Sequence, residues 1–200
     1  MANGKVCTGF SKPYVALYSA EGTTISYASG TVLARGVEVS LEPESSDGVD
    51  FYADNTIGES VGGVFTGGTV TLTVDGLKKA ARNLIMGVTT TETVTVGSSS
   101  VSVSVYDDDQ KAPYVGIGFL ARYMEDGTET WSPVVLTKCV FDVDGLEAAT
   151  QEENIEFQTE ELTATIMRDD SAKHAWRKIA DDQTSESAGE DVLKALLNIS

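Results

Sequence analysis

Histidine, a frequent general base in enzymes, occurs once in this chain, at position 174. A Ser-His-Asp arrangement for nucleophilic catalysis would therefore have to use His174. This residue lies in the stretch SAKHAWRK, beside Trp176 and among basic residues, in what reads as a short final strand. A histidine at the surface or at a strand edge is the simpler interpretation, and we expect no catalytic role for it.

Acidic residues are the second set of side chains that could do chemistry, here as metal ligands. The stretch FDVDGLEAATQEEN resembles a calcium loop, which needs oxygen ligands at positions 1, 3 and 5, glycine at 6 and glutamate at 12. In this chain Asp142 and Asp144 are followed by Gly145 at position 4, so the register is wrong. Nothing indicates the cleft that a catalytic carboxylate pair needs. We therefore expect no metal, no cofactor and no enzymatic activity.

Glycine spacing and charge argue against phosphate and nucleic-acid binding. The glycine-rich stretch SVGGVFTGG (60–68) matches neither GxGxxG nor GxxxxGK[ST]. The net charge is −17, and the arginines are scattered singly. Such a surface repels nucleic acid and gains nothing from anionic lipid, so we expect neither as a specific partner.

Targeting and redox signals point to a protein made in a cytoplasm. The opening stretch MANGKVCTGF lacks the pattern of a secretion signal, and no stretch approaches the ~20 apolar residues of a membrane helix. Cys7 and Cys139 show no CxxC spacing, and we expect both to be reduced thiols.

Most of the elements that must position these side chains read as β-strands. The 200 residues suit one domain with a sizeable core, and apolar residues recur at period two. The predicted strands span 13–20, 24–28, 31–43, 68–74, 91–96, 100–106, 114–124, 130–141, 154–159 and 162–167. The Asp126-Gly127 pair predicts a tight hairpin, and the turn GSSS predicts a second one within 91–106.

Two helices complete the predicted elements. In DGLKKAARNLIMG, Asp75 can cap the start, Gly87 can end the helix, and an apolar stripe lies between them. Near the C-terminus, Ser187 and Glu190 have the spacing of a capping box ahead of a second apolar stripe.

One stretch, FYADNTIGES (51–60), fits this pattern poorly. It places Phe51 and Tyr52 beside an acidic, glycine-containing segment. Two interpretations are open: an ordinary turn between strand ends, or a loop that becomes ordered only against a partner. The rings would then be anchors and the nearby glycines slack.

The order of three stretches resembles the major tail proteins of long-tailed, non-contractile bacteriophages, which form the tail tube. The first is VEVSLEPESSDGVDFYADN (37–55), a strand, an acidic turn and an aromatic-Ala-Asp-Asn signature. The second is 114–167, a glycine-rich strand, a hairpin, a strand ending in Lys-x-x-Phe, an Ala-Thr segment and Ile-x-Phe-x-Thr. The third is a Trp-containing strand followed by an acidic linker and a short amphipathic helix.

The resemblance implies a mainly β fold, a β-sandwich or small barrel with one flanking helix and a short C-terminal helix. It implies hexameric rings that stack into a tube, with inter-subunit sheet pairing around the lumen. Residues 1–12 would be an N-terminal arm, 13–182 a core with a long loop at about 43–66, and 183–200 an acidic linker and helix. A decorating C-terminal domain is not implied.

The same resemblance suggests a ring-stacking contact, partners and a location. The long loop would reach the neighbouring ring, which makes Phe51, Tyr52, Asp54 and Asn55 the expected interface residues. Partners would be further copies of the chain and the tail terminator, tape measure and distal tail proteins. Genomic DNA would only pass through the lumen. The protein would be synthesised in the bacterial host cytoplasm and reside in the virion tail.

Two other function classes stay open from the sequence. A carbohydrate- or protein-binding β-sandwich could use Tyr14, Tyr18, Tyr27 and Trp131 as exposed stacking rings. A hydrolase would depend on His174.

Overall fold

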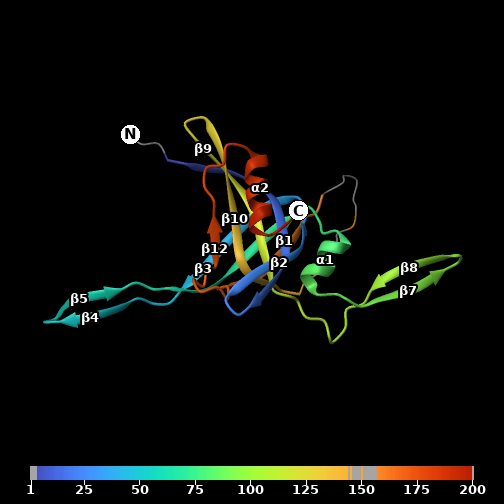
Figure 1. Cartoon of the computed structure of the whole chain (residues 1–200), viewed down its shortest axis with the longest axis horizontal. Helices are drawn as coiled ribbons and strands as arrows, with labels where there is room; N and C mark the ends of the chain where they lie inside the picture. The colour runs from blue at the N-terminus through green and yellow to red at the C-terminus, as the bar shows by residue number, and fades with distance from the viewer. Residues whose placement is uncertain (1–3, 144, 146–149, 151–156, 200) are drawn as a thin grey trace.

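A single large antiparallel sheet forms the body of the molecule (Figure 1). The computed structural model of the chain describes residues 4–143, 145, 150 and 157–199. The main path of the sheet runs in the order β2-β1-β9-β10-β11-β6-β3, and β12 pairs with β10 beside this path. Its strands are β1 (Val6–Glu21), β2 (Thr24–Val32), β3 (Gly36–Ser45), β6 (Phe65–Val74), β9 (Val115–Glu125), β10 (Thr128–Phe141), β11 (Glu160–Met167) and β12 (Arg177–Ile179).

Period-two alternation in the sequence becomes an alternation of sheet faces. Val70, Leu72 and Leu162 are buried, whereas Thr71 and Thr163, which lie opposite each other in β6 and β11, keep part of their exposure. The inward side chains of β6 and β11 belong to the main hydrophobic core. One face of these strands therefore holds the core together, and the other is a polar surface.

The sheet curls until β3 approaches β1. The Phe10 ring of β1 packs over Gly36 of β3, where a Cβ atom would lie 2.2 Å from the ring. The helix α1 (Lys79–Met86) buries Ala81, Ile85 and Met86 in the core enclosed by this curl. The predicted mainly β fold with one flanking helix and a short C-terminal helix is confirmed.

The ends of α1 were predicted with mixed success. Gly87 ends the helix as expected, in the left-handed conformation with φ 67°. Asp75 does not cap it: the residue before the helix is Lys78, without a side-chain cap. The Asp75 carboxylate instead accepts a hydrogen bond from the Arg35 backbone N–H at 2.9 Å and pairs with the Arg35 guanidinium. A tertiary contact has taken the side chain away from the helix.

The C-terminal helix α2 (Glu186–Leu196) covers the opposite face of β1, β9 and β10. Leu193 packs directly on Gly118 of β9, where a Cβ atom would lie 2.6 Å from Leu193 Cδ1. Its cap is Ser185, whose hydroxyl accepts a hydrogen bond from the Ala188 backbone N–H at 3.1 Å, so the predicted cap at Ser187 is wrong.

Two hairpins project from this body in opposite directions (Figure 1). The first consists of β4 (Val49–Ala53) and β5 (Thr56–Val61), the second of β7 (Thr91–Val96) and β8 (Ser99–Ser104). We call residues 49–61 the β4–β5 arm and residues 91–104 the β7–β8 ribbon. The arm lies in the segment that was expected to be a long loop, which is thus largely strand.

Other boundaries also differ from the expected ones. Residues 6–12, assigned from the sequence to an N-terminal arm, are the first part of β1 and pair with β9 up to Ser11. The predicted strand 154–159 lies partly outside the described residues, and its last three residues are not in a strand. In the described part of the chain, no helix is long and apolar enough to cross a membrane.

Candidate functional site

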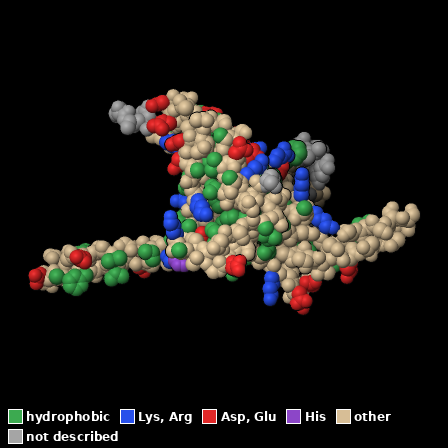
Figure 2. Space-filling view, in the orientation of Figure 1, with side chains coloured by type: hydrophobic (Ala, Val, Ile, Leu, Met, Phe, Trp, Pro, Cys, Tyr) green, Lys and Arg blue, Asp and Glu red, His purple; other side chains and the backbone are tan. Residues whose placement is uncertain are grey.

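The β4–β5 arm exposes large apolar side chains to solvent along its whole length. Phe51 and Tyr52 are 65% and 64% exposed. The aliphatic residues around them are exposed as well; they are Val49, Ile57, Val61 and Val64. In Figure 2 these hydrophobic side chains line the arm on the left, well away from the body.

A tight turn sets the geometry of the arm. Asp54 and Asn55 have positive φ values of 50° and 62°, the pattern of a two-residue type I′ turn, which favours asparagine and aspartate. Ala53 and Thr56 pair on either side of it, and the Thr56 hydroxyl donates to the Ala53 carbonyl oxygen at 3.0 Å. The turn expected in this stretch is therefore present, and it gives Asp54 and Asn55 a conformational role.

The register of the arm makes both of its faces apolar. Val49 lies opposite Val61, and Phe51, on the same face, lies opposite Glu59. The register shifts at the next pair, so that Tyr52 lies opposite Ile57 on the other face. An apolar pair on each side of a two-stranded sheet cannot be buried by one neighbouring surface alone.

The root of the arm is held by close backbone contacts. The Ser46 backbone N–H donates to the Val64 carbonyl oxygen at 2.9 Å, and the Val64 N–H donates to the Ser46 hydroxyl at 3.1 Å. A Cβ atom on Gly63 would lie 1.9 Å from the Ser46 carbonyl oxygen. The expectation that the glycines supply slack is thus wrong for Gly63, which permits this close approach.

This geometry suits binding to another protein surface. A two-stranded hairpin is only marginally stable in water without further strands or a packed face. Contiguous exposed apolar surface marks interaction sites, and free strand edges pair with other chains. The arm provides both features at once.

A second surface is the outer face of β3, β6 and β11. These three strands contain no Lys or Arg. We call their outward side chains the threonine–glutamate face; they are Glu38, Ser40, Glu42, Glu44, Thr69, Thr71, Thr73, Glu161, Thr163 and Thr165. Alternation places these side chains on one face, but strand phase alone does not identify which face is covered and so does not tell which acidic residues would face a lumen. The burial of Val70 and Leu72 shows that the threonine–glutamate face is the uncovered one.

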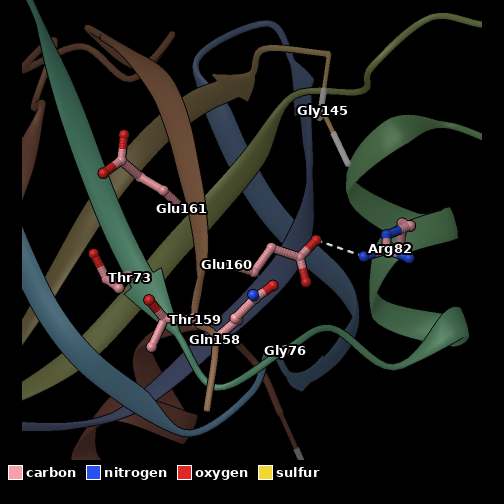
Figure 3. A pocket seen from close by; sticks show the side chains of 8 residues that line it. All are labelled: Thr73, Gly76, Arg82, Gly145, Gln158, Thr159, Glu160 and Glu161. Atoms are coloured by element: carbon pink, nitrogen blue, oxygen red, sulfur yellow. Dashed lines mark hydrogen bonds and ion pairs between the residues drawn. The ribbon is translucent and has the colours of Figure 1, made fainter. Parts of the chain in front are cut away.

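A polar cavity of about 590 Å³ lies between β6, β11 and α1 (Figure 3). Within it, the Arg82 guanidinium contacts the Glu160 carboxylate at 2.5 Å, and Glu160 also accepts from the Leu77 N–H at 2.9 Å. Both contacts tie β11 to the start of α1. Since these groups hold two elements together, we assign the cavity a structural role.

His174, the residue considered for catalysis, lies in a hydrogen-bonded turn with Asp169 and Ser171. The His174 ring lies 3.2 Å from the Asp169 carbonyl oxygen, in a turn with φ 48° and not in a strand. The Ser171 hydroxyl donates to the Asp169 carboxylate at 2.6 Å. Within the described ranges no group of three or more potential metal-binding residues occurs, and Asp144 lies outside them.

The rings considered for sugar stacking are mostly covered. Tyr14 and Tyr27 are buried under α2, and Tyr18 and Trp131 pack against the same cluster. The Tyr27 hydroxyl donates to the Thr137 carbonyl oxygen at 2.8 Å. These rings are part of the packing between α2 and the sheet, so the exposure that sugar stacking would need is not present.

Comparison with known proteins adds no assignment. No protein-family model matches the chain, and no curated protein matches it.

Proposed function

We propose that this chain is a structural subunit of a bacteriophage tail tube, which assembles with copies of itself into stacked rings. The observation that carries the proposal is the β4–β5 arm, a projecting hairpin with Phe51 on one face and Tyr52 on the other, both about two-thirds exposed. The order of the sequence motifs, which resembles that of tail tube proteins, suggests the family. In this proposal the arm reaches a neighbouring subunit and becomes buried there.

The charge of the molecule is consistent with a conduit that does not retain DNA. Phosphate binding draws on Lys and Arg, which release counterions from the polymer. The threonine–glutamate face contains neither, and we assign it to the wall of the lumen. Six copies of −17 would carry −102 per ring, if the ring is hexameric as in the family.

In this proposal the subunit is purely structural and has a defined set of partners. The subunit has no enzymatic role and uses no cofactor. Its partners are other copies of the chain and the tail terminator, tape measure and distal tail proteins, and DNA passes through without specific contact. The protein is made in the host cytoplasm and resides in the virion tail.

Negative-stain electron microscopy of the concentrated, purified protein tests the proposal. Rings or tubes at high protein concentration and moderate salt are the expected result, because salt screens the repulsion between acidic copies. The proposal would be contradicted if the protein stayed monomeric at every salt and protein concentration and was absent from virions.

A further inference from the structure

The β7–β8 ribbon has two faces of opposite chemistry. Val94 lies directly opposite Val101, Val96 and Val103 extend the same face, and Glu92 at the base and Ser99 near the tip complete it. These four valines are between 41% and 65% exposed. The other face carries hydroxyl side chains only; they are Thr91, Thr93, Thr95, Ser100, Ser102 and Ser104. In antiparallel sheets, an apolar face usually packs against another surface and a polar face is usually solvated, so the valine face is the one expected to be covered.

Contacts at its base orient the ribbon. The Asn83 side-chain amide of α1 donates to the Ser104 hydroxyl at 3.1 Å, and the Lys79 ammonium donates to the Ser102 carbonyl oxygen at 3.0 Å. Ser104 belongs to the hydroxyl face, so this face is the one that meets α1 at the base. The side of the ribbon visible in Figure 2 shows few hydrophobic side chains, as expected for the hydroxyl face.

The ribbon carries little charge. Residues 91–104 contain a single charged side chain, Glu92, in a chain of net charge −17. Glu92 lies opposite Val103 at the base end of the valine face, so the uncharged part of that face is the part toward the tip, with Val94, Val96 and Val101. Like charges oppose association wherever they face each other closely, so contacts between copies are favoured at weakly charged apolar surfaces.

We propose that the valine face of the β7–β8 ribbon receives the β4–β5 arm of a second copy, through the arm face that carries Val49, Phe51 and Val61. This inference rests on the proposed function and names the partner surface of the arm. Both elements are two-stranded sheets with strands of five or six residues, and apolar sheet faces stack about 10 Å apart. The arm and the ribbon point in opposite directions from the body, so the contact is head-to-tail and can repeat (Figure 1).

In the competing arrangement, two ribbons pair valine face to valine face. This arrangement buries less apolar surface. It would close a dimer and leave Phe51 and Val61 of both copies in water. The head-to-tail contact buries an apolar face of the arm and the valine face of the ribbon in every copy.

Cross-linking between two single-cysteine variants tests the contact. Cys7 is exposed and is replaced by serine in every protein, and Cys139 is buried. One protein carries Val61→Cys, a second carries Val101→Cys, and one of them bears a size tag. A short bis-maleimide should join the two variants under assembly conditions. Thr93→Cys, on the hydroxyl face of the same ribbon, is the matched control and should not be joined to Val61→Cys.

Each outcome decides the inference. Cross-linking of Val101→Cys only to itself would show valine-to-valine pairing and overturn it, as would the absence of cross-links in a protein that forms tubes. In the second case the proposed function would stand without this contact. Cross-links between Val61→Cys and Val101→Cys in a protein that never forms rings or tubes would support the contact and contradict the tube.

An isosteric pair of substitutions provides a second readout. Val94→Thr with Val101→Thr keeps the β-branched shape at exposed positions, so the fold should persist. The protein concentration needed for assembly should rise about tenfold or more, because the docked face loses its apolar centre. Unchanged assembly would contradict the inference.

Discussion

Phe51 and Tyr52 are adjacent in sequence but lie on opposite faces of the β4–β5 arm. Phe51 shares its face with Val49 and Val61, whereas Tyr52 lies opposite Ile57 on the other. Neither ring has a core of its own chain to enter, since both are about two-thirds exposed. An arm of this kind gains its stability from what it contacts, whereas the body is stabilised by its own core.

The turn of the arm should tolerate only residues that accept positive φ. Asn55 has φ 62°, and a β-branched residue there costs about 1–2 kcal/mol. We expect Asn55→Val to weaken assembly while the body keeps its thermal unfolding temperature. Asn55→Gly is the matched control and should assemble as the native protein does. Equal assembly by both variants, measured by sedimentation, would show that the shape of the arm does not matter.

The packing of α2 on the sheet should depend on Gly118. A Cβ atom at this position would lie 2.6 Å from Leu193 Cδ1 and 2.8 Å from Leu197 Cδ1, in a buried contact. Gly118→Ala should lower the free energy of unfolding by about 1–3 kcal/mol, the usual cost of overpacking. Gly67→Ala is the control, because its added Cβ would meet only the Ile166 carbonyl oxygen, at 3.7 Å. Denaturant titration measures both, and equal effects would contradict the assignment.

Glu190 should make the docking of α2 sensitive to acid. Its carboxylate accepts from the Tyr14 hydroxyl at 2.5 Å and pairs with Lys194 at 2.9 Å and Lys12 at 3.1 Å, which together lower its pKa from 4.5 to about 2. A pKa that is lower in the folded state stabilises the protein above pH 4.5, and this contribution is lost as the pH falls toward 2.

Comparison with a neutral variant isolates this contribution from the other carboxylates. Glu190→Gln should be less stable than the native protein at neutral pH, and the difference should shrink between pH 4.5 and about 2. Unfolding monitored through Trp131, which packs beside α2, provides the measurement. A difference that stays constant with pH would refute the role of Glu190.

Much of the body could be predicted from the sequence because the signals there are local. Asp126 and Gly127 form the expected tight turn, with φ 48° and 78°, and Gly87 ends α1. The caps at Asp75 and Ser187 were wrong for a different reason. The Asp75 carboxylate binds Arg35, 40 residues away, and so does not cap the helix. Ser185, two residues before Ser187, has the same hydroxyl group and is the residue that caps α2. Local spacing does not decide between such partners.

The candidate site could be predicted only in part. The two rings of the arm stood out in the sequence, and the structure leaves both about two-thirds exposed, whereas their contact with another surface stays a prediction. The valine face of the ribbon was missed, although the hairpin itself was predicted. Alternation shows that Val94 and Val101 share a face, but it does not show whether that face is covered.

The assignment of the threonine–glutamate face to the lumen can be tested by chemical access. In a Cys7→Ser background, Thr71→Cys places a thiol in the middle of this face. A small maleimide should label it in tubes and in unassembled protein. A maleimide on a large polyethylene glycol chain should label it only in unassembled protein, because the tube excludes the polymer. Equal labelling of tubes by both reagents would place the face outside.

The central claim is that at least one of the two rings of the arm buries against another subunit. Side-by-side electron microscopy of the native protein and the Phe51→Ala, Tyr52→Ala double variant tests it most directly, with Ser60→Ala, an exposed polar position on the same arm, as control. Truncating an aromatic anchor at an interface costs about 2 kcal/mol or more, and neither ring supports the body. We predict tubes from the native protein and the control, and folded, unassembled subunits from the double variant. Normal tubes from the double variant would contradict the claim.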